Sequence, residues 1–302
     1  MIPKRSSFVT GALGALALAW GTAANTASPT PIGAEHGMVV SAHRLASRAG
    51  IDVLRTGGNA VDAAVAVGYA LAVTFPEAGN LGGGGFMTIR FHDGRTAFID
   101  FRETAPAAAT ATMFLDANGD PVPERSRRGY LAVGVPGTVA GLELARTKFG
   151  TRARPALMAS AIRLARGGFV LDQGDADMLA DAADEFRKDR PSAAIFLNRN
   201  QPWKPGQRLV QTDLARTLSE IAKNGPAAFY NGPIAAKIAA LGRSLRNSSA
   251  ASASMSASPW SSTNPSRASR IALAIKAARV RVPNFVRASS SPATVPGTPT
   301  AR

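Results

Sequence analysis

Four consecutive glycines constrain the fold of this chain more than any other feature of its sequence. They lie in the segment Asn80–Met87, where the backbone can pass through places that no Cβ atom would fit and can adopt positive φ angles. Two apolar runs follow, Phe86–Phe91 and Thr96–Phe101, with Asp93-Gly94 between them. An Asp-Gly pair between apolar runs is a strong signal for a β-hairpin. The sequence therefore predicts a hairpin after a tight structural loop formed by Gly82, Gly83, Gly84 and Gly85.

The second predicted strand ends at Arg102, beside this loop. The planar fork of a guanidinium matches a carboxylate, so an arginine fixed at a strand end can bind a small anion. It can also pair with Asp100 or Glu103 and do no more than fix the strand end, and the residues alone leave both interpretations open. Glu103 is a second candidate. It can support Arg102, face a substrate amine, or form a surface ion pair.

Four motifs in a fixed order carry a resemblance to a known family. They are Gly57–Ala64 (GGNAVDAA), Ala78–Met87 (AGNLGGGGFM), Asp100–Glu103 (DFRE) and Val135–Gly141 (VPGTVAG). With them, the chain resembles the gamma-glutamyltranspeptidases, or glutathione hydrolases, of the N-terminal-nucleophile hydrolase superfamily. The resemblance extends roughly over residues 37–240.

The resemblance implies an α+β fold, namely part of an αββα sandwich that lacks the small-subunit half. It also implies transfer of the γ-glutamyl group of glutathione to water or an amino acceptor, through an ester on a threonine freed by self-cleavage. The printed sequence contains no Thr-Thr-His segment, so we expect no catalytic nucleophile in this chain and no activity from it alone. By the same resemblance, Arg102 binds the α-carboxylate of the glutamyl group.

The expected ligands are glutathione or other γ-glutamyl compounds, with amino acids or dipeptides as acceptors, and a small-subunit counterpart would be needed to complete the site. No cofactor and no nucleic acid are expected. No metal is expected either, because His36, His43 and His92 show no ligand spacing and the chain has no cysteine. Two alternatives remain: a non-catalytic γ-glutamyl-binding protein, and a binder of membrane surface or nucleic acid that acts through a basic tail.

The first residues have the order of a secretory signal. Lys4 and Arg5 precede the apolar stretch Phe8–Trp20, and small residues follow up to Ala27. This order predicts a cleaved signal over 1–27 and a periplasmic or secreted protein. A buried N-terminal helix or an uncleaved anchor is the alternative.

Between these ends, residues 37–240 form the predicted globular body. Apolar spacing, caps and proline breaks predict a set of helices over this part of the chain. They span His43–Leu54, Ala60–Val73, Pro136–Lys148, Pro155–Arg166, Leu209–Lys223 and Pro233–Leu241.

The chain changes character after residue 240. Eight arginines and one lysine, with no acidic residue, lie in 241–302, so nine of the fifteen net positive charges of the chain belong to this Ser/Ala/Pro-rich tail. Such a segment buries too little apolar area to offset the entropy of ordering. We favour a translation product that has left the reading frame of the family. A natural disordered tail and a binding arm remain the alternatives.

Overall fold

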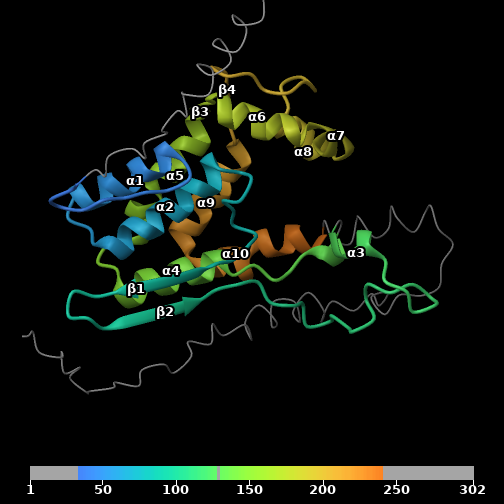
Figure 1. The fold of residues 1–302 in the computed structure, drawn as a ribbon, viewed down its shortest axis with the longest axis horizontal. Helices are drawn as coiled ribbons and strands as arrows, with labels where there is room; N and C mark the ends of the chain where they lie inside the picture. The colour runs from blue at the N-terminus through green and yellow to red at the C-terminus, as the bar shows by residue number, and fades with distance from the viewer. Residues whose placement is uncertain (1–32, 128–129, 241–302) are drawn as a thin grey trace, which may run out of the picture. The chain divides into compact units, whose positions relative to one another are not determined.

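The computed structural model describes residues 33–127 and 130–240 (Figure 1). The predicted signal at 1–27 and the basic tail at 241–302 lie outside these residues. The chain divides into two compact units, Met1–Met38 and Val39–Arg302, and every element named below belongs to the second. Within the described residues, no helix has both the length and the apolar character that a membrane crossing requires.

Two helices near the start of the body begin with side-chain caps. α1 (Arg44–Arg55) follows His43, whose Nδ1 accepts a hydrogen bond from the backbone two residues on. α2 (Ala60–Thr74) follows Asn59, which exchanges hydrogen bonds with Asp62 in a capping box. The surface shared by the two helices is lined by small residues, which allows close approach: Ala46, Ala49 and Ala70.

Asp62 also joins α2 to the loop between α4 (Thr138–Phe149) and α5 (Arg154–Gly167). Its carboxylate is fully buried and accepts hydrogen bonds from the Thr151 hydroxyl and from the backbone N–H groups of Thr151 and Arg152, at 2.7–3.1 Å. Burial by itself raises the pKa of Asp62, but these bonds to the ionised form outweigh burial, and the pKa is lowered.

A second carboxylate joins α4 to α5 directly. Glu143 of α4 accepts paired hydrogen bonds from both Arg146 and Arg154. Burial raises the pKa of Glu143, but the two guanidinium groups more than compensate and bring it to about 2. Glu143 therefore stays ionised at neutral pH and ties α4 to Arg154, the first residue of α5.

The predicted hairpin is formed by β1 (Phe86–Arg90) and β2 (Thr96–Asp100), paired antiparallel with Phe86 opposite Asp100. Its turn depends on Gly94, which adopts a φ of 83°, in the left-handed region that favours glycine. One face of the hairpin packs toward α4 through Met87, Ile89, Ala97 and Ile99.

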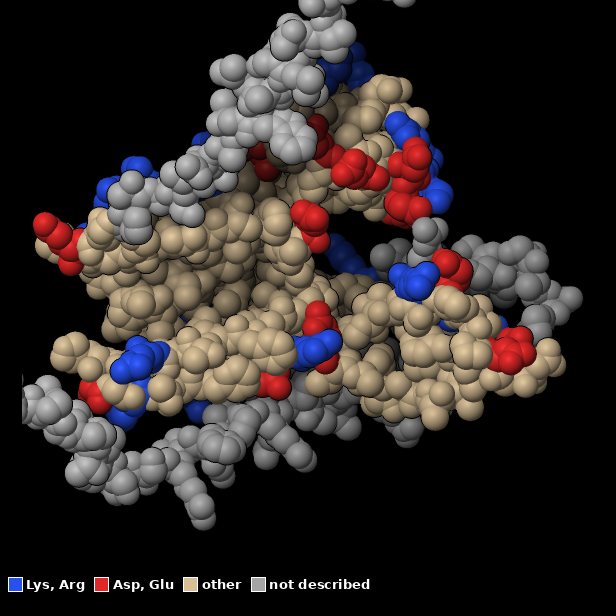
Figure 2. Space-filling model, viewed as in Figure 1, with Lys and Arg blue, Asp and Glu red and all other residues tan. Residues whose placement is uncertain are grey.

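The opposite face of the hairpin is open to solvent. Phe86 and Phe98 stack on this face with their ring centroids 5.9 Å apart, and they are 55% and 43% exposed. In the space-filling view the surface along the middle of the hairpin is uncharged, and charged side chains gather at its two ends (Figure 2). An apolar strip of this kind is typical of a surface that another part of a protein covers.

The core is mainly helical. α2 packs against α1, α4 and α5, and α9 (Thr212–Asn224) packs against α5 (Figure 1). α10 (Pro226–Tyr230) contacts both α4 and α9. Many of the largest buried side chains come from these helices and from β2, among them Tyr69, Ile99, Leu157, Met158, Leu218 and Ile221.

The remaining elements are short. β3 (Phe169–Val170) pairs with β4 (Arg208–Leu209), and residues 233–240 are helical. The others are α3 (Pro123–Arg127), the 3-10 helix η1 (Tyr130–Ala132), α6 (Gln173–Asp181), α7 (Ala183–Lys188) and α8 (Arg190–Phe196).

One predicted helix begins in the wrong place. We expected a helix from Leu209, but Leu209 pairs with Phe169 in the β3–β4 ladder and is fully buried there. The helix starts only at Thr212, after Gln211, whose side chain donates to the carbonyl of Val73 at 2.7 Å. The other predicted helices and both strands of the hairpin agree with the structure within two residues over the described ranges.

We predict that Asp62→Asn lowers the free energy of unfolding by about 3 kcal/mol at neutral pH, because an amide cannot accept all the bonds that the carboxylate accepts. Since folding lowers the pKa of Asp62, this contribution is complete above the ordinary value of 3.8 and is lost as the pH falls below it. Urea unfolding of the unaltered chain and of Asp62→Asn, followed by circular dichroism at several pH values from neutral to acidic, tests this. The difference in unfolding free energy between the two should shrink as the pH falls.

The matched control is Asp52→Asn. Asp52 is 45% exposed and pairs with Arg48 on the surface of α1. This substitution should change the unfolding free energy by less than about 1 kcal/mol. Equal losses from the two substitutions would contradict the role given to Asp62.

Candidate functional site

The glycine loop packs against the exit of β2 in a way that excludes side chains. A Cβ atom on Gly84 would lie 2.6 Å from the Phe101 carbonyl oxygen and 2.8 Å from the Cα of Arg102. The Phe101 ring fills the space beside Gly85 and Gly141, where added Cβ atoms would lie 2.9 and 2.1 Å from it. The interpretation of the loop as a tight structural turn therefore has a steric basis.

Hydrogen bonds hold the loop in this position. Asn80 accepts a bond from the backbone N–H of Gly83 through its side-chain oxygen. The carbonyl of Gly83 in turn accepts from the N–H groups of Gly137 and Thr138, at 2.7 and 3.0 Å. The loop is thereby joined to the first residues of α4, which lie more than fifty positions further along the chain.

Arg102 lies exposed at the exit of β2. Its backbone N–H donates to the carboxylate of Asp100 at 3.0 Å, but within the described ranges no side chain pairs with its guanidinium. The alternative in which Arg102 forms an ion pair with Asp100 or Glu103 therefore finds no support there. A free guanidinium on a fixed backbone is suited to bind an anionic ligand.

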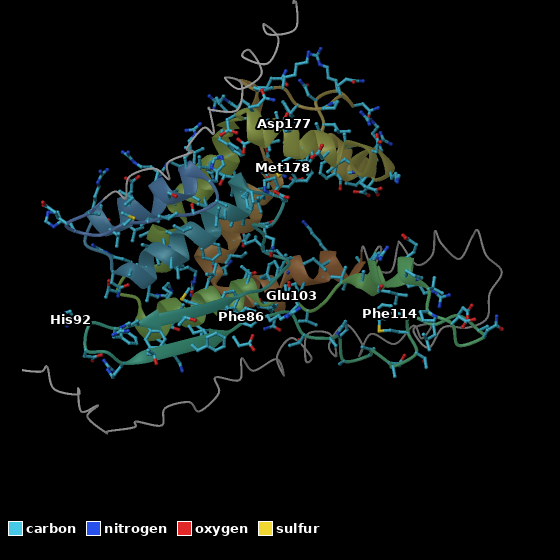
Figure 3. All side chains as sticks on the ribbon, in the orientation of Figure 1. Phe86, His92, Glu103, Phe114, Asp177 and Met178 are labelled. Carbon is cyan, nitrogen blue, oxygen red and sulfur yellow. The ribbon has the colours of Figure 1, made fainter. Side chains whose placement is uncertain are left out.

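Glu103 is also exposed, and neighbouring segments of the chain hold its backbone in place. Figure 3 shows it beside Phe86, at the opposite end of the hairpin from His92. A Cβ atom on Gly134 would lie 2.9 Å from the Cβ of Glu103. The next residue, Thr104, exchanges two backbone hydrogen bonds with Val135, at 3.3 and 2.8 Å. The segment that carries Arg102 and Glu103 is thus fixed from behind by residues just before α4.

A hollow of about 470 Å³ lies elsewhere, between the end of α2, α8 and the start of α9. Its lining is mostly apolar, and neither Arg102 nor Glu103 is part of it. The two predicted substrate residues therefore lie on open surface, outside this hollow, and their roles remain predictions.

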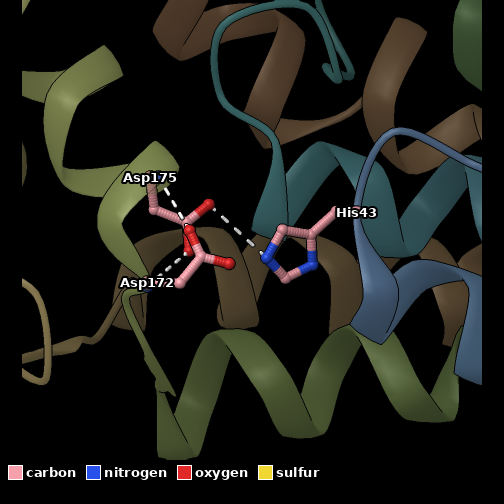
Figure 4. Close-up of side chains that lie close together, drawn as sticks. All are labelled: His43, Asp172 and Asp175. Carbon is pink, nitrogen blue, oxygen red and sulfur yellow. Dashed lines mark hydrogen bonds and ion pairs between the residues drawn. The ribbon is translucent and has the colours of Figure 1, made fainter. Parts of the chain in front are cut away.

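A cluster that the sequence did not suggest brings His43 together with Asp172 and Asp175 (Figure 4). One ligand atom from each residue lies within 4.8 Å of the others. His43 and Asp175 are only 5% and 7% exposed, and the Nε2 of His43 lies 3.5 Å from Asp175 Oδ1. The two aspartates also cap each other's backbone at the start of α6.

The hydrogen bonding of His43 argues against a metal ion in this cluster. Its Nδ1 accepts a bond from the backbone N–H of Leu45 at 3.2 Å, so in the neutral ring the proton is on Nε2. A protonated Nε2 has no lone pair for a metal, and it faces the carboxylate of Asp175 instead. We therefore interpret the cluster as a structural contact between α1 and α6. His36 and His92 are exposed and lie outside the cluster.

Comparisons with known proteins agree with the family expected from the four motifs. The family model of gamma-glutamyltranspeptidase matches residues 46–245. The chain is 59% identical over 217 residues to the glutathione hydrolase proenzyme of Pseudomonas sp. (strain A14), which covers 72% of this chain. It is 52% identical over 210 residues, or 69% of its length, to the glutathione hydrolase proenzyme of Escherichia coli (strain K12).

Solved structures give the same result. The gamma-glutamyltranspeptidase of Helicobacter pylori matches with a TM-score of 0.67 and 46% identity, over 69% of this chain and 60% of that one. The gamma-glutamyltranspeptidase from Pseudomonas nitroreducens, complexed with L-DON, matches with a TM-score of 0.66 and 40% identity, over 71% and 62% of the two chains.

Fold and motifs together define an N-terminal-nucleophile hydrolase of mixed helix and strand, present in part. The chain belongs to the gamma-glutamyltranspeptidase family. It spans 38% and 36% of the lengths of the two curated relatives named above. The α+β class and the family expected from the sequence are confirmed.

The sequence did not single out Tyr230, whose hydroxyl reaches the start of α4 from α10. No local pattern around Tyr230 indicates this contact, because its partners lie 90 or more positions earlier in the chain. Asn80 did have a signal, since it lies inside the glycine motif. Its bond to Gly83 is a short-range turn contact of the kind that asparagine favours.

We predict that Gly137→Ala destabilises the fold by more than about 3 kcal/mol, because the new Cβ would lie 1.8 Å from the Phe101 carbonyl oxygen and the backbone must move. Gly82→Ala is the matched control, since nothing lies within 4 Å of a Cβ at that position. Thermal unfolding of both variants tests the difference. A Gly82→Ala chain as unstable as Gly137→Ala would refute the steric explanation.

Proposed function

We propose that this chain is the glutamyl-recognising part of a gamma-glutamyltranspeptidase. In the complete enzyme, the γ-glutamyl group of glutathione passes to water or to an amino acid or dipeptide acceptor through an ester on a threonine. The observation that carries the proposal is the exposed guanidinium of Arg102 at the exit of β2, which has no side-chain partner among residues 33–127 and 130–240, in a chain of this family. The chain spans 38% of the length of the curated relative from Pseudomonas sp. (strain A14), and we propose that by itself it binds without turnover.

The chemistry follows from the charges of the ligand. The α-carboxylate of a glutamyl group accepts two parallel hydrogen bonds from the guanidinium of Arg102, and such a charge-assisted pair contributes roughly 2 kcal/mol to binding. Glu103, the next residue, carries the opposite charge and is also exposed, and we propose that it faces the α-amine. Together the two side chains would select a zwitterionic amino-acid head group over a simple carboxylic acid.

The remaining part of the enzyme is the partner that we propose for the open face of the hairpin. A two-stranded sheet is only marginally stable without cover on its apolar side chains. Phe86 and Phe98 form an exposed stacked pair on that face. A small-subunit counterpart that packs on this pair would cover the apolar strip and, at the same end of the hairpin, enclose Arg102.

We further propose that the protein is exported. This rests only on the order of charged, apolar and small residues in 1–27, which lie outside the described part of the chain. Fractionation of cells that express the full chain, with N-terminal sequencing of the product, tests both the location and the cleavage.

We predict that the purified chain binds glutamate weakly and that Arg102→Ala reduces this binding by about thirtyfold, which corresponds to the loss of roughly 2 kcal/mol. The glutamate affinity of Arg102→Lys should lie between those of the unaltered chain and Arg102→Ala, because an ammonium group keeps the charge but lacks the planar fork. Ligand-detected NMR titration is suited to such weak binding. The matched control is Arg90→Ala, which removes an exposed arginine from the same hairpin.

The same preparation should release no chromogenic amine from a γ-glutamyl amide. Turnover by the purified chain would show that it contains a nucleophile. This result would overturn the proposal that the chain by itself only binds the glutamyl group. Equal binding by the unaltered chain and Arg102→Ala would remove Arg102 from the site. Binding without turnover is also what a non-catalytic γ-glutamyl-binding protein would show, and recovery of activity on addition of the missing segment separates the two.

A further inference from the structure

The first turn of α4 lacks a side-chain cap of its own. The residue at its N-cap is Gly137, which has no side chain to accept the free N–H groups of a helix start. Glycine is required there because a Cβ would collide with the Phe101 carbonyl. The close approach of Phe101 to α4 requires glycine at this position, and α4 therefore has no N-cap side chain.

Two distant groups supply the caps instead. The carbonyl of Gly83 accepts the N–H groups of Gly137 and Thr138. The hydroxyl oxygen of Tyr230, from α10, accepts the N–H of Ala140 at 3.1 Å. Tyr230 is 8% exposed, and burial raises its pKa to about 12, so the hydroxyl keeps its proton.

That proton is used as well. The Tyr230 hydroxyl donates to the carbonyl of Pro136 at 3.0 Å, so one oxygen atom ties together the residues on both sides of Gly137. Pro136 directly follows Val135, which exchanges two backbone bonds with Thr104. Thr104 lies two residues after Arg102. Tyr230 thus holds the segment against which the exit of β2 is fixed.

We propose that Tyr230 is a positioning residue for the guanidinium of Arg102. The inference rests on the proposed function, in which Arg102 binds the glutamyl α-carboxylate. Without the hydroxyl, the carbonyl of Pro136 and the N–H of Ala140 lose their partner. The segment from Val135 to Ala140 then loosens, and the backbone that carries Arg102 is no longer held in one position for its guanidinium to meet a carboxylate. Preorganisation of this kind contributes to affinity without any direct contact with the ligand.

The test compares glutamate with its α-amide, which lacks the α-carboxylate. Tyr230→Phe removes only the hydroxyl and should weaken the binding of glutamate to the full chain by about tenfold, the upper range for one net hydrogen bond. Binding of the α-amide should not change. Arg102→Ala is measured alongside, and the double variant should bind glutamate no more weakly than Arg102→Ala alone, because both changes act through one guanidinium.

Two controls separate positioning from general stability. Tyr69→Phe removes another buried hydroxyl, which has no hydrogen-bond partner among the described residues, and should leave both affinities unchanged. Phe229→Leu loosens the packing of α10 but leaves both bonds of the Tyr230 hydroxyl available. Amide-resolved hydrogen exchange should show faster exchange at Ala140, Val135 and Thr104 in Tyr230→Phe than in Tyr69→Phe.

Each outcome decides between the two proposals. Unchanged glutamate binding in Tyr230→Phe, together with a loss in Arg102→Ala, overturns the role of Tyr230 and leaves that of Arg102 intact. Equal losses for glutamate and the α-amide, the same losses in Phe229→Leu, or failure of Tyr230→Phe to fold would each assign Tyr230 a purely structural role. An Arg102→Ala chain that binds like the unaltered chain, or an unaltered chain that does not bind glutamate, contradicts the carboxylate site itself and the positioning role with it.

Discussion

Three backbone segments meet around Phe101 with no Cβ atoms between them, and the rest of the site depends on this contact. Gly84, Gly137 and Gly141 each approach Phe101 so closely that an added Cβ would lie 1.8–2.6 Å from one of its atoms. This approach brings the glycine loop, the exit of β2 and the start of α4 together in one place. The position of Arg102, the residue after Phe101, is therefore set by steric exclusion before any ligand binds.

Hydrogen bonds to helix starts then hold the arrangement. The carboxylate of Asp62 ties the first turn of α2 to the loop before α5, and the Tyr230 hydroxyl ties the first turn of α4 to α10. In both cases free N–H groups or carbonyls receive a partner from a distant part of the chain. The bonds of Tyr230 hold the start of α4, and Val135 just before it pairs with Thr104 beside the exit of β2, so a change in α10 can reach the segment that carries Arg102.

The family and the geometry lead to one account of what this chain contributes. It presents an exposed guanidinium on a rigid support and an apolar hairpin face open to solvent. In the function proposed above, the guanidinium recognises the glutamyl group and the hairpin face receives a partner. The exposed pair Phe86 and Phe98 lies on the same hairpin that presents Arg102, so a partner that covered the pair would also lie close to this guanidinium.

The sequence by itself determined the features that depend on neighbouring residues. The Asp93-Gly94 turn and the glycine loop before a strand follow from local spacing, and the motifs of the sequence placed the chain in its family. It did not determine contacts between distant residues. The pairing of Leu209 with Phe169 turned the start of a predicted helix into a strand, and the bond from Tyr230 to Pro136 spans 94 positions. Only the tertiary structure decided these, because the partner of a buried donor or apolar side chain is chosen by which elements pack together, and local pattern does not encode that choice.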